Sequence, residues 1–431
     1  MMTENRDLSE RTDRHFSPQA GVEKKKGRVF RNTLWLTGSL AVGRGLSYLG
    51  FILLARMYSE QEVGIWAVLL TACLFAEILS NLGLDKIVVR DIIRSEANDA
   101  ELLLSSTLLV KLVFSLVVAV AAYTAIITWY PEIAAGYSLS VGVYLCVVPC
   151  IAVTRTLEAW HTARERMHIP ALAQVLERFS LLFVIILCWL MRADFTVFLI
   201  AGALAPVMRC LVALKGVLAH IRPPGFGKYK SLLKEALLLF AVEAVAGVYL
   251  RVDILLVSRM QSLEAAAQYN AAFRMFEVFT VLFAGYLTAI FPSLVKRTRF
   301  ATLRGTFLLG LCAMVCAAFL GIISRKFLLG LFGPSYLAAA DAFTALMLTL
   351  PLCYGTSFFT NYLIASGRIP LLLRMSIVVV SSNVLLNLTL IPRLSITGSG
   401  MAFLISEVIS CIFMALVMYY FIKRDRQVMH A

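Results

Sequence analysis

Twelve charged side chains lie inside long apolar stretches of this chain, and a purely apolar helix would not need them. Each costs about 2.5–3.5 kcal/mol at the centre of a bilayer on insertion scales. They must therefore face a hydrated cavity, pair with one another, or reach toward a membrane surface. The basic ones are Arg44, Lys111, Arg178, Arg209, Arg251 and Arg274, and the acidic ones are Glu77, Glu177, Glu243, Asp253, Glu277 and Glu407.

Two of the arginines, Arg44 and Arg274, lie near the middle of their stretches, one in each half of the chain. Ser47 lies one turn after Arg44 in a small-to-polar stripe that suits a cavity wall. Asn270 and Glu277 share a helical face with Arg274, and Glu277 either lines the same wall or only holds Arg274 in place. Arginine stays charged and binds phosphate oxygens through a planar fork.

The other cations are less central. Arg178 and Lys111 lie about two turns from the ends of their stretches, so each either lines a cavity or extends to the surface. Arg251 lies nearer an end, where extension to the surface is the expected arrangement. Among the carboxylates, Glu77, Glu243 and Glu407 are candidates for carrying a proton, because a carboxylate in a low-dielectric cavity can hold one. The alternative role for each is to pair structurally with an arginine or to bond two helices together.

The sequence contains none of the motifs expected of a membrane enzyme or an ATP-driven pump. It lacks D-x-D, H-E-x-x-H, G-x-S-x-G and the G-x-x-x-x-G-K-[ST] phosphate loop. The nine cysteines all fall in apolar stretches and form no C-x-x-C pair, so neither a metal site nor a disulfide framework is predicted. Loops at 130–138, 191–193 and 392–399 are too short for a catalytic domain. No cofactor is expected.

The elements that position these charges are twelve apolar stretches, each close to the ~20 residues that cross a bilayer as a helix. Of the 431 residues, 60% are hydrophobic and 15% are charged, against about 25% charged in soluble proteins. An all-α polytopic membrane protein is therefore predicted. The expected spans are 33–55, 62–84, 103–128, 138–157, 171–191, 194–214, 235–256, 267–290, 305–323, 339–360, 371–391 and 398–421.

The loop charges orient these spans. If the N-terminus is cytoplasmic, 28 basic residues of tails and loops, Arg155 among them, lie inside and six lie outside. This is the positive-inside pattern, so both termini are expected in the cytoplasm. The net charge of +14 then reflects topology, and nucleic-acid binding is not expected. Residues 1–31 lack an apolar stretch and are expected to be a disordered cytoplasmic tail, not a signal peptide.

The two halves of the chain echo each other at a spacing of about 202 residues. Segment 56–67 resembles 259–270, Pro149 corresponds to Pro351, and 163–166 corresponds to 365–368. Six spans per half give parallel repeats about an axis along the membrane normal. The expected parts are an N-lobe at 32–220, a cytoplasmic linker at 221–233, a C-lobe at 234–422 and a cytoplasmic C-tail at 423–431. Two such bundles around a central cavity are typical of alternating-access transporters.

Five loose motifs in this order and spacing resemble a known family over about residues 30–422. They are LARM at 54–57, EVGIW at 62–66, NLGL at 81–84, LFGPSY at 331–336 and NVLLNLTLIP at 383–392. The chain is identified as similar to the polysaccharide-unit flippases (O-antigen, Wzx-type), within the multidrug/oligosaccharidyl-lipid/polysaccharide exporter superfamily. It departs from the pattern at Ala267, where glycine is common. Twelve spans, where the lipid II branch usually has fourteen, argue against that branch.

The resemblance implies translocation of an undecaprenyl-pyrophosphate-linked oligosaccharide across a bacterial cytoplasmic (inner) membrane, as in O-antigen or lipopolysaccharide synthesis. Arg44 and Arg274, with Arg178 and Lys111, are then expected to hold the pyrophosphate. Glu77, Glu243 and Glu407 are expected to couple transport to H⁺ or Na⁺, as in an antiporter. Membrane lipids surround the protein, and a polymerase and a chain-length regulator are possible partners. The alternatives are a multidrug or small-molecule exporter of the same superfamily, and a membrane-embedded glycan polymerase or glycosyltransferase. The predicted site thus consists of seven residues: Arg44, Lys111, Arg178, Arg274, Glu77, Glu243 and Glu407.

Overall fold

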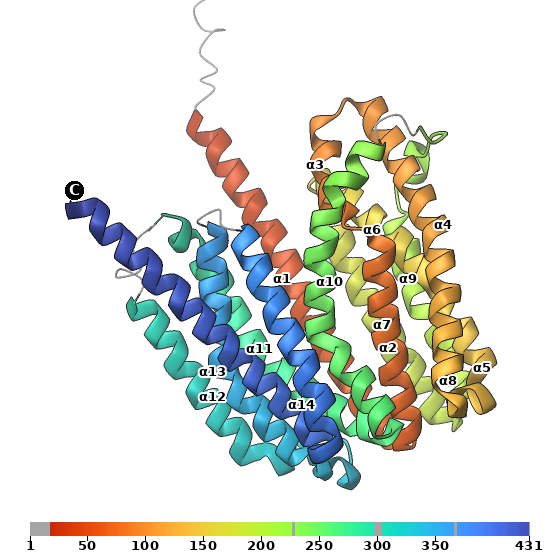
Figure 1. The fold of residues 1–431 in the computed structure, drawn as a ribbon. Coiled ribbons are helices and arrows are strands. Elements are labelled where there is room, and N and C mark those ends of the chain that lie inside the picture. The colour runs from red at the N-terminus through yellow and green to blue at the C-terminus, as the bar shows by residue number, and fades with distance from the viewer. Residues whose placement is uncertain (1–17, 226–228, 297–303, 366–368, 431) are drawn as a thin grey trace, which may run out of the picture.

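The chain folds into two lobes of packed helices in a computed structural model (Figure 1). The structure describes residues 18–225, 229–296, 304–365 and 369–430. Every regular element in these ranges is a helix, which confirms the predicted all-α class. The start of α1 and the end of α14 lie at the same end of the molecule, which we call the tail side, and we call the other end the far side.

Six crossings build the N-lobe, and two of them are broken into paired helices. The pairs meet at Cys146 and Ala203, single residues between consecutive helices. The helices are α1 (Pro18–Met57), α2 (Glu60–Asn81), α4 (Ala97–Trp129), α5 with α6 (Pro131–Leu145 and Val147–Ala163), α7 (His168–Met191), and α8 with α9 (Phe195–Gly202 and Leu204–Ala213). A short 3-10 turn, η1 (Leu218–His220), follows.

The C-lobe contains the other six crossings. They are formed by α10 (Tyr229–Met260), α11 (Leu263–Lys296), α12 (Arg304–Gly330), η3 (Pro334–Ala339) with α13 (Ala340–Ala365), and α14 (Ile369–His430). The last of these holds two crossings, because its backbone leaves helical geometry at Ser395. Ser399 Oγ donates to Asn387 Oδ1 at 2.8 Å. Residues twelve apart in one straight helix would lie about 18 Å apart, so the chain reverses at this kink.

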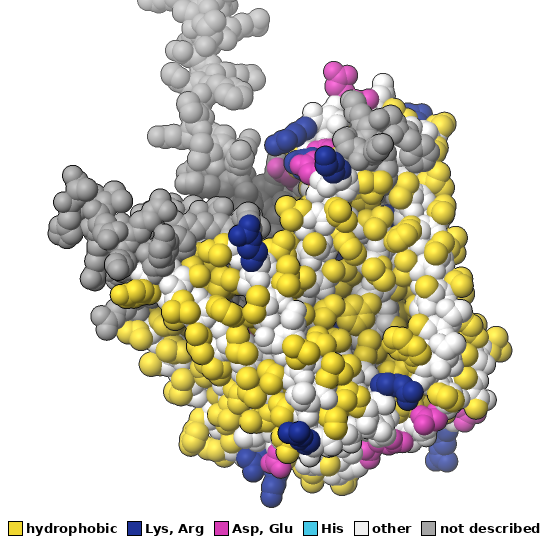
Figure 2. Space-filling view, viewed as in Figure 1, with side chains coloured by type: hydrophobic (Ala, Val, Ile, Leu, Met, Phe, Trp, Pro, Cys, Tyr) yellow, Lys and Arg dark blue, Asp and Glu magenta, His cyan; other side chains and the backbone are white. Residues whose placement is uncertain are grey.

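The surface and the helix lengths agree with a membrane-crossing protein. Figure 2 shows hydrophobic side chains over the middle of the visible face, with Lys, Arg, Asp and Glu mainly near its two ends. Nine helical segments in the described ranges are long and apolar enough to span a bilayer. Segment 371–417 contains two crossings, and α10 and α11, which carry several charges, supply the remaining two. The predicted twelve crossings in two six-helix lobes are thus confirmed.

Equivalent hairpins open both lobes, as the internal repeat predicts. Ser59 caps α2, since its Oγ accepts the Glu62 backbone N–H at 3.3 Å and the Glu62 carboxylate accepts the Ser59 N–H at 2.9 Å. At the matching place in the second half, Ser262 Oγ accepts the Ala265 backbone N–H at 3.1 Å. Each serine satisfies a backbone donor that the first turn leaves free. The same local chemistry therefore starts the second helix of each lobe.

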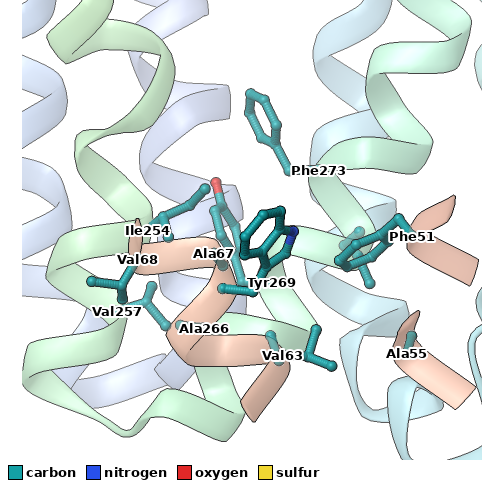
Figure 3. Packing of buried hydrophobic residues seen from close by; sticks show 14 of the residues in the cluster. Phe51, Ala55, Val63, Ala67, Val68, Ile254, Val257, Ala266, Tyr269 and Phe273 are labelled. Atoms are coloured by element: carbon teal, nitrogen blue, oxygen red, sulfur yellow. The ribbon is translucent and has the colours of Figure 1, made fainter. Parts of the chain in front are cut away.

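Small side chains let the two lobes approach each other along α2, α10 and α11. Figure 3 shows Ala67 and Val68 of α2 packed among Ile254, Ala266 and Tyr269 from the C-lobe helices. A Cβ on Gly64 would overlap the Leu263 carbonyl, so only glycine allows this approach of backbones. α10 packs against α2 as well as against α14 of its own lobe.

The short helix α3 (Leu84–Arg94) was not predicted. It begins after a turn in which Leu82 and Gly83 have φ of 50° and 71°, in the left-handed region that ends helices. Its buried Leu84, Ile87 and Ile92 pack against other N-lobe residues on the tail side. At its exposed face Arg90 donates two hydrogen bonds to Glu235 of α10, at 2.6 and 2.9 Å. The bonds to Glu235, and a further bond to the neighbouring aspartate, raise the pKa of Arg90.

The ends of the expected parts differ from the helix boundaries. α1 begins at Pro18, so residues 18–31 of the expected tail form its first turns, and residues 1–17 lie outside the described residues. α10 begins at Tyr229 within the expected linker, and α14 continues through the expected C-tail to His430. Arg155, counted among the loop cations, lies within α6.

Candidate functional site

A cavity of about 410 Å³ lies against helices of both lobes. Its wall carries four arginines and three glutamates, together with small and polar residues from α1, α2, α7 and α11. Most of the lining comes from the N-lobe, and α10 and α11 close it from the C-lobe side. The charged residues on the wall are Arg44, Arg178, Arg251, Arg274, Glu77, Glu177 and Glu277.

Three of the predicted cations, Arg44, Arg178 and Arg274, meet at this cavity. The packing of α1 against α7 brings the first two to the same cavity. Arg274 comes from α11, and its guanidinium carbon lies 4.5 Å from the ring centroid of Phe51 on α1. The Nε of Arg274 is buried without a hydrogen-bond partner.

Each carboxylate on the cavity wall already forms an ion pair with an arginine. Arg155 Nε lies 2.5 Å from Glu77 Oε1, and Arg251 Nη2 lies 2.8 Å from Glu277 Oε1. The third, Glu177, is 3.0 Å from Arg209. Arg209 also makes a two-pronged contact with Glu158, at 2.8 Å through each nitrogen.

The balance of charge around the cavity is positive. Six arginines face four glutamates when the partners just behind the wall are included. Within the described chain, Arg44, Arg178 and Arg274 form no ion pair. An unpaired guanidinium in a low-dielectric cavity attracts an anion strongly. The wall therefore carries a surplus of positive charge that can attract an anion.

Lys111 lies elsewhere, in a buried network on the tail side of the N-lobe. Its side chain is completely buried, and its Nζ donates to Asn81 Oδ1 at 2.7 Å and to Asp85 Oδ1 at 2.5 Å. The Asn81 amide in turn donates to Glu243 of α10 at 3.0 Å. Glu243 also lies 3.7 Å from Lys86. Two predicted site residues, Lys111 and Glu243, are therefore members of one inter-helix network, and neither is part of the cavity wall.

A second cavity, of about 370 Å³, lies between α10, α13 and α14 of the C-lobe and contains Glu407. The Glu407 carboxylate accepts hydrogen bonds from Tyr249 Oη and, at 3.0 Å, from Thr356 Oγ1. It is 5% exposed and has no basic partner among the described residues. Of the three carboxylates predicted to carry an ion, Glu407 is thus the one without a cation beside it. The described residues include no group of three or more His, Cys, Asp or Glu placed to hold a metal.

Sequence reasoning missed the part that Arg251 and Arg155 play. Arg251 was expected to extend to the membrane surface, yet it lies on the cavity wall with Glu277 one helix away. Its guanidinium carbon is 5.1 Å from the ring of Phe273. The available signal was an acidic residue in a neighbouring span for each basic one, but the sequence does not say which faces meet.

The chain resembles known proteins in sequence and in fold. Residues 29–298, more than half of the chain, match the family model described as "Polysaccharide biosynthesis protein". No curated protein matches in sequence. Among solved structures, the lipid II flippase MurJ in an inward closed conformation superposes with a TM-score of 0.72 at 14% identity, over 89% of this chain and 87% of that one.

Two transporters of the MOP superfamily share the same fold. An inward-facing multidrug resistance MATE family transporter gives a TM-score of 0.67 at 13% identity, over 92% of this chain and 98% of that one. A MOP superfamily transporter from Pyrococcus furiosus, described by the reverse polarity of its binding pocket, gives 0.61 at 12%, over 90% and 95%. The two six-helix lobes described above fit this fold. The chain belongs to the polysaccharide biosynthesis protein family, and it shares the fold of the lipid II flippase MurJ and of MATE family transporters.

Proposed function

We propose that this transporter moves an undecaprenyl-pyrophosphate-linked oligosaccharide across the membrane, from the cytoplasmic to the periplasmic leaflet. The observation that carries the proposal is the set of three arginines, Arg44, Arg178 and Arg274, which line one cavity and form no ion pair within the described residues. A lipid-linked pyrophosphate carries about two negative charges, which hydrocarbon alone would exclude. Arginine forks match its oxygens and remain charged during the passage.

The neighbouring glutamates support this choice of ligand. A wall with free carboxylates would attract cations, as expected of an exporter of cationic drugs. Here Glu77 and Glu277 are occupied by Arg155 and Arg251, so the groups left to bind a ligand are cationic. The family match supports a glycan-bearing substrate, and the superposition on the lipid II flippase supports a fold able to pass one.

Coupling to an ion is assigned to Glu407 in the second cavity. A carboxylate surrounded by hydroxyl groups can take up a proton or a sodium ion without breaking an ion pair. Glu77 and Glu243 would each have to give up a basic partner first. We therefore place H⁺ or Na⁺ coupling at Glu407, which is 5% exposed.

The proposed setting is the bacterial cytoplasmic membrane, with the tail side facing the cytoplasm. The basic residues of the loops favour this orientation. Among the described ones, Lys86, Arg90 and Arg222 follow crossings that end on the tail side, where α1 begins and α14 ends. A polymerase and a chain-length regulator remain proposed partners on the periplasmic side.

A reconstituted assay tests the proposed function. The full-length protein is placed in vesicles with a fluorescent prenyl-pyrophosphate-linked sugar, and movement between leaflets is followed by the fraction quenched by external dithionite. The wild type should move the lipid, and R44A, R178A and R274A should each lose most of this activity. R393A, which removes an exposed arginine away from the cavity, is the matched control and should retain it.

Normal movement in all three cavity variants would refute the assignment of the anion site. If the wild type instead moves a small organic cation and leaves the lipid in place, the multidrug exporter is the correct alternative.

A further inference from the structure

Asn270 is a buried polar residue of the cavity wall, and it takes no part in the ion pairs described above. It lies on α11, four residues or about one turn before Arg274, and is 1% exposed. Among the residues that the structure describes, its Nδ2 has no hydrogen-bond partner, and neither has the Nε of Arg274. Both residues line the cavity. Two neighbouring N–H donors at one wall are thus left without acceptors.

Such donors are uncommon in folded proteins, because each buried and unsatisfied group costs about 1–3 kcal/mol. Residues four apart on a helix have their Cβ atoms about 5–6 Å from each other. The two donors can therefore be satisfied by a single ligand that presents several acceptor oxygens.

The internal repeat shows that the fold itself does not require this amide. At the repeat spacing of 203, Asn270 corresponds to Ala67 of α2, and Arg274 corresponds to Thr71. Ala67 and Thr71 also lie on the wall of the same cavity. An alanine thus occupies the equivalent place of an equivalent helix. The polar pair on α11 is a property of this wall and of the ligand it meets.

The chemistry of the pair selects the kind of oxygen it binds. A sugar hydroxyl donates as well as accepts, so it also needs an acceptor from the wall. The nearby wall carboxylates, Glu277 and Glu77, are already held by Arg251 and Arg155. Phosphoryl oxygens only accept, and they can take both N–H groups at once.

We infer that Asn270 is a direct ligand of the substrate's diphosphate, acting together with Arg274, and that this pair recognises the diphosphate and not the sugar. This inference rests on the proposed function and adds a neutral donor to its three arginines. The amide N–H orients the diphosphate through a hydrogen bond, and the arginines attract it through their charge.

The test measures equilibrium binding of farnesyl diphosphate, a short prenyl diphosphate without sugar, to the full-length protein in detergent, with farnesol as the control for its apolar tail. N270A copies the residue found at the equivalent position 67. It should weaken farnesyl diphosphate binding roughly tenfold or more, the loss expected for one hydrogen bond to a charged group. Farnesol binding should not change. N98A is the matched control, because Asn98 is exposed near the start of α4 and lines neither cavity.

Thermal unfolding of the ligand-free protein separates a ligand from a structural group. N270A removes an unsatisfied donor, so its unfolding temperature should equal or exceed that of the wild type. A clear fall would mark the amide as structural and overturn the inference. N270D is the second variant, and its carboxylate should weaken diphosphate binding at least as much as N270A does.

Two further outcomes keep this inference apart from the proposed function. If R274A loses farnesyl diphosphate binding while N270A and N270D bind like the wild type, the anion site stands and the role of Asn270 is refuted. If R44A, R178A and R274A also all bind farnesyl diphosphate like the wild type, the anion site of the proposed function fails and this inference fails with it.

Discussion

Arg274 of α11 lies over the ring of Phe51 of α1, with 4.5 Å between the guanidinium carbon and the ring centroid. The contact joins the two lobes at the edge of the larger cavity. A cation–π contact attracts the positive charge to the ring and supplies no hydrogen-bond acceptor to the N–H groups. The ring therefore holds an unpaired cation in place without using the donors that a phosphate would need.

Replacing this ring should weaken anion binding without removing any charge. We expect F51L to bind farnesyl diphosphate a few-fold less tightly, because a cation–π contact contributes about 0.5–2 kcal/mol to the position of the cation. F183L removes an exposed ring on α7 that is 52% accessible and should bind like the wild type. Equal affinity for F51L and F183L, measured by titration, would show that Arg274 does not depend on the ring.

Lys111 should matter for folding and not for the substrate. K111M leaves Asp85 and Asn81 without their buried donor, and breaking a buried pair from one side costs about 3–5 kcal/mol. We expect a strong loss of folded protein and a lower unfolding temperature. K86M, at a side chain that is 66% exposed and 3.7 Å from its partner, is the control and should change little.

The double variant K111M/D85N should recover part of the lost stability, because it also removes the stranded carboxylate. If K111M is as stable as the wild type and loses only diphosphate binding, Lys111 belongs to the substrate site after all.

Glu407 should control the response to an ion gradient. E407Q keeps the shape of the side chain and one of the two oxygens that accept from Tyr249 and Thr356, but it cannot exchange a proton. In vesicles carrying an imposed proton or sodium gradient, the wild type should move lipid faster than without it, and E407Q should move it at the same rate in both conditions. E132Q, an exposed change at the start of α5, should behave like the wild type. Acceleration of E407Q by either gradient would exclude this residue as the coupling site.

Gly64 should be needed for the close contact of α2 with α11. A methyl group there overlaps the Leu263 carbonyl, and such overpacking costs about 1–3 kcal/mol. G64A should lower the unfolding temperature and increase the labelling of a cysteine introduced at Ala266, which is fully buried. G136A adds its methyl to open space and should be neutral or slightly stabilising. If G64A unfolds and labels like G136A, the two backbones are not in this contact.

The crossings and their order could be predicted because apolar length and turn chemistry are local. Ser59 and Ser262 both precede a helix and cap it, and the offset between them is visible in the sequence. α3 was missed because Leu84, at which the second apolar stretch was expected to end, is the first residue of the new helix. The turn before α3 requires Leu82 to adopt a left-handed backbone conformation. A leucine in the sequence does not predict such a conformation.

The partners of the buried charges could not be predicted in the same way. Glu77 and Arg155 lie 78 residues apart and meet only because α2 and α6 present particular faces to each other. Lys111 and Arg178 looked alike, since both lie about two turns from the end of an apolar stretch. Packing sends one into a sealed network and the other to the cavity wall. Helix rotation about its own axis separates these two outcomes, and it is a property of the whole bundle.

Finally, the two cavities share no lining residue in the described chain. If the substrate and the coupling ion competed for the same ligands, binding of one would displace the other. Their transport stoichiometry would then follow from this competition. If the proposed substrate and coupling ion occupy these separate cavities, no shared ligand prevents the ion from crossing alone. Tight coupling would then require that the lobes change conformation only when both cavities are filled.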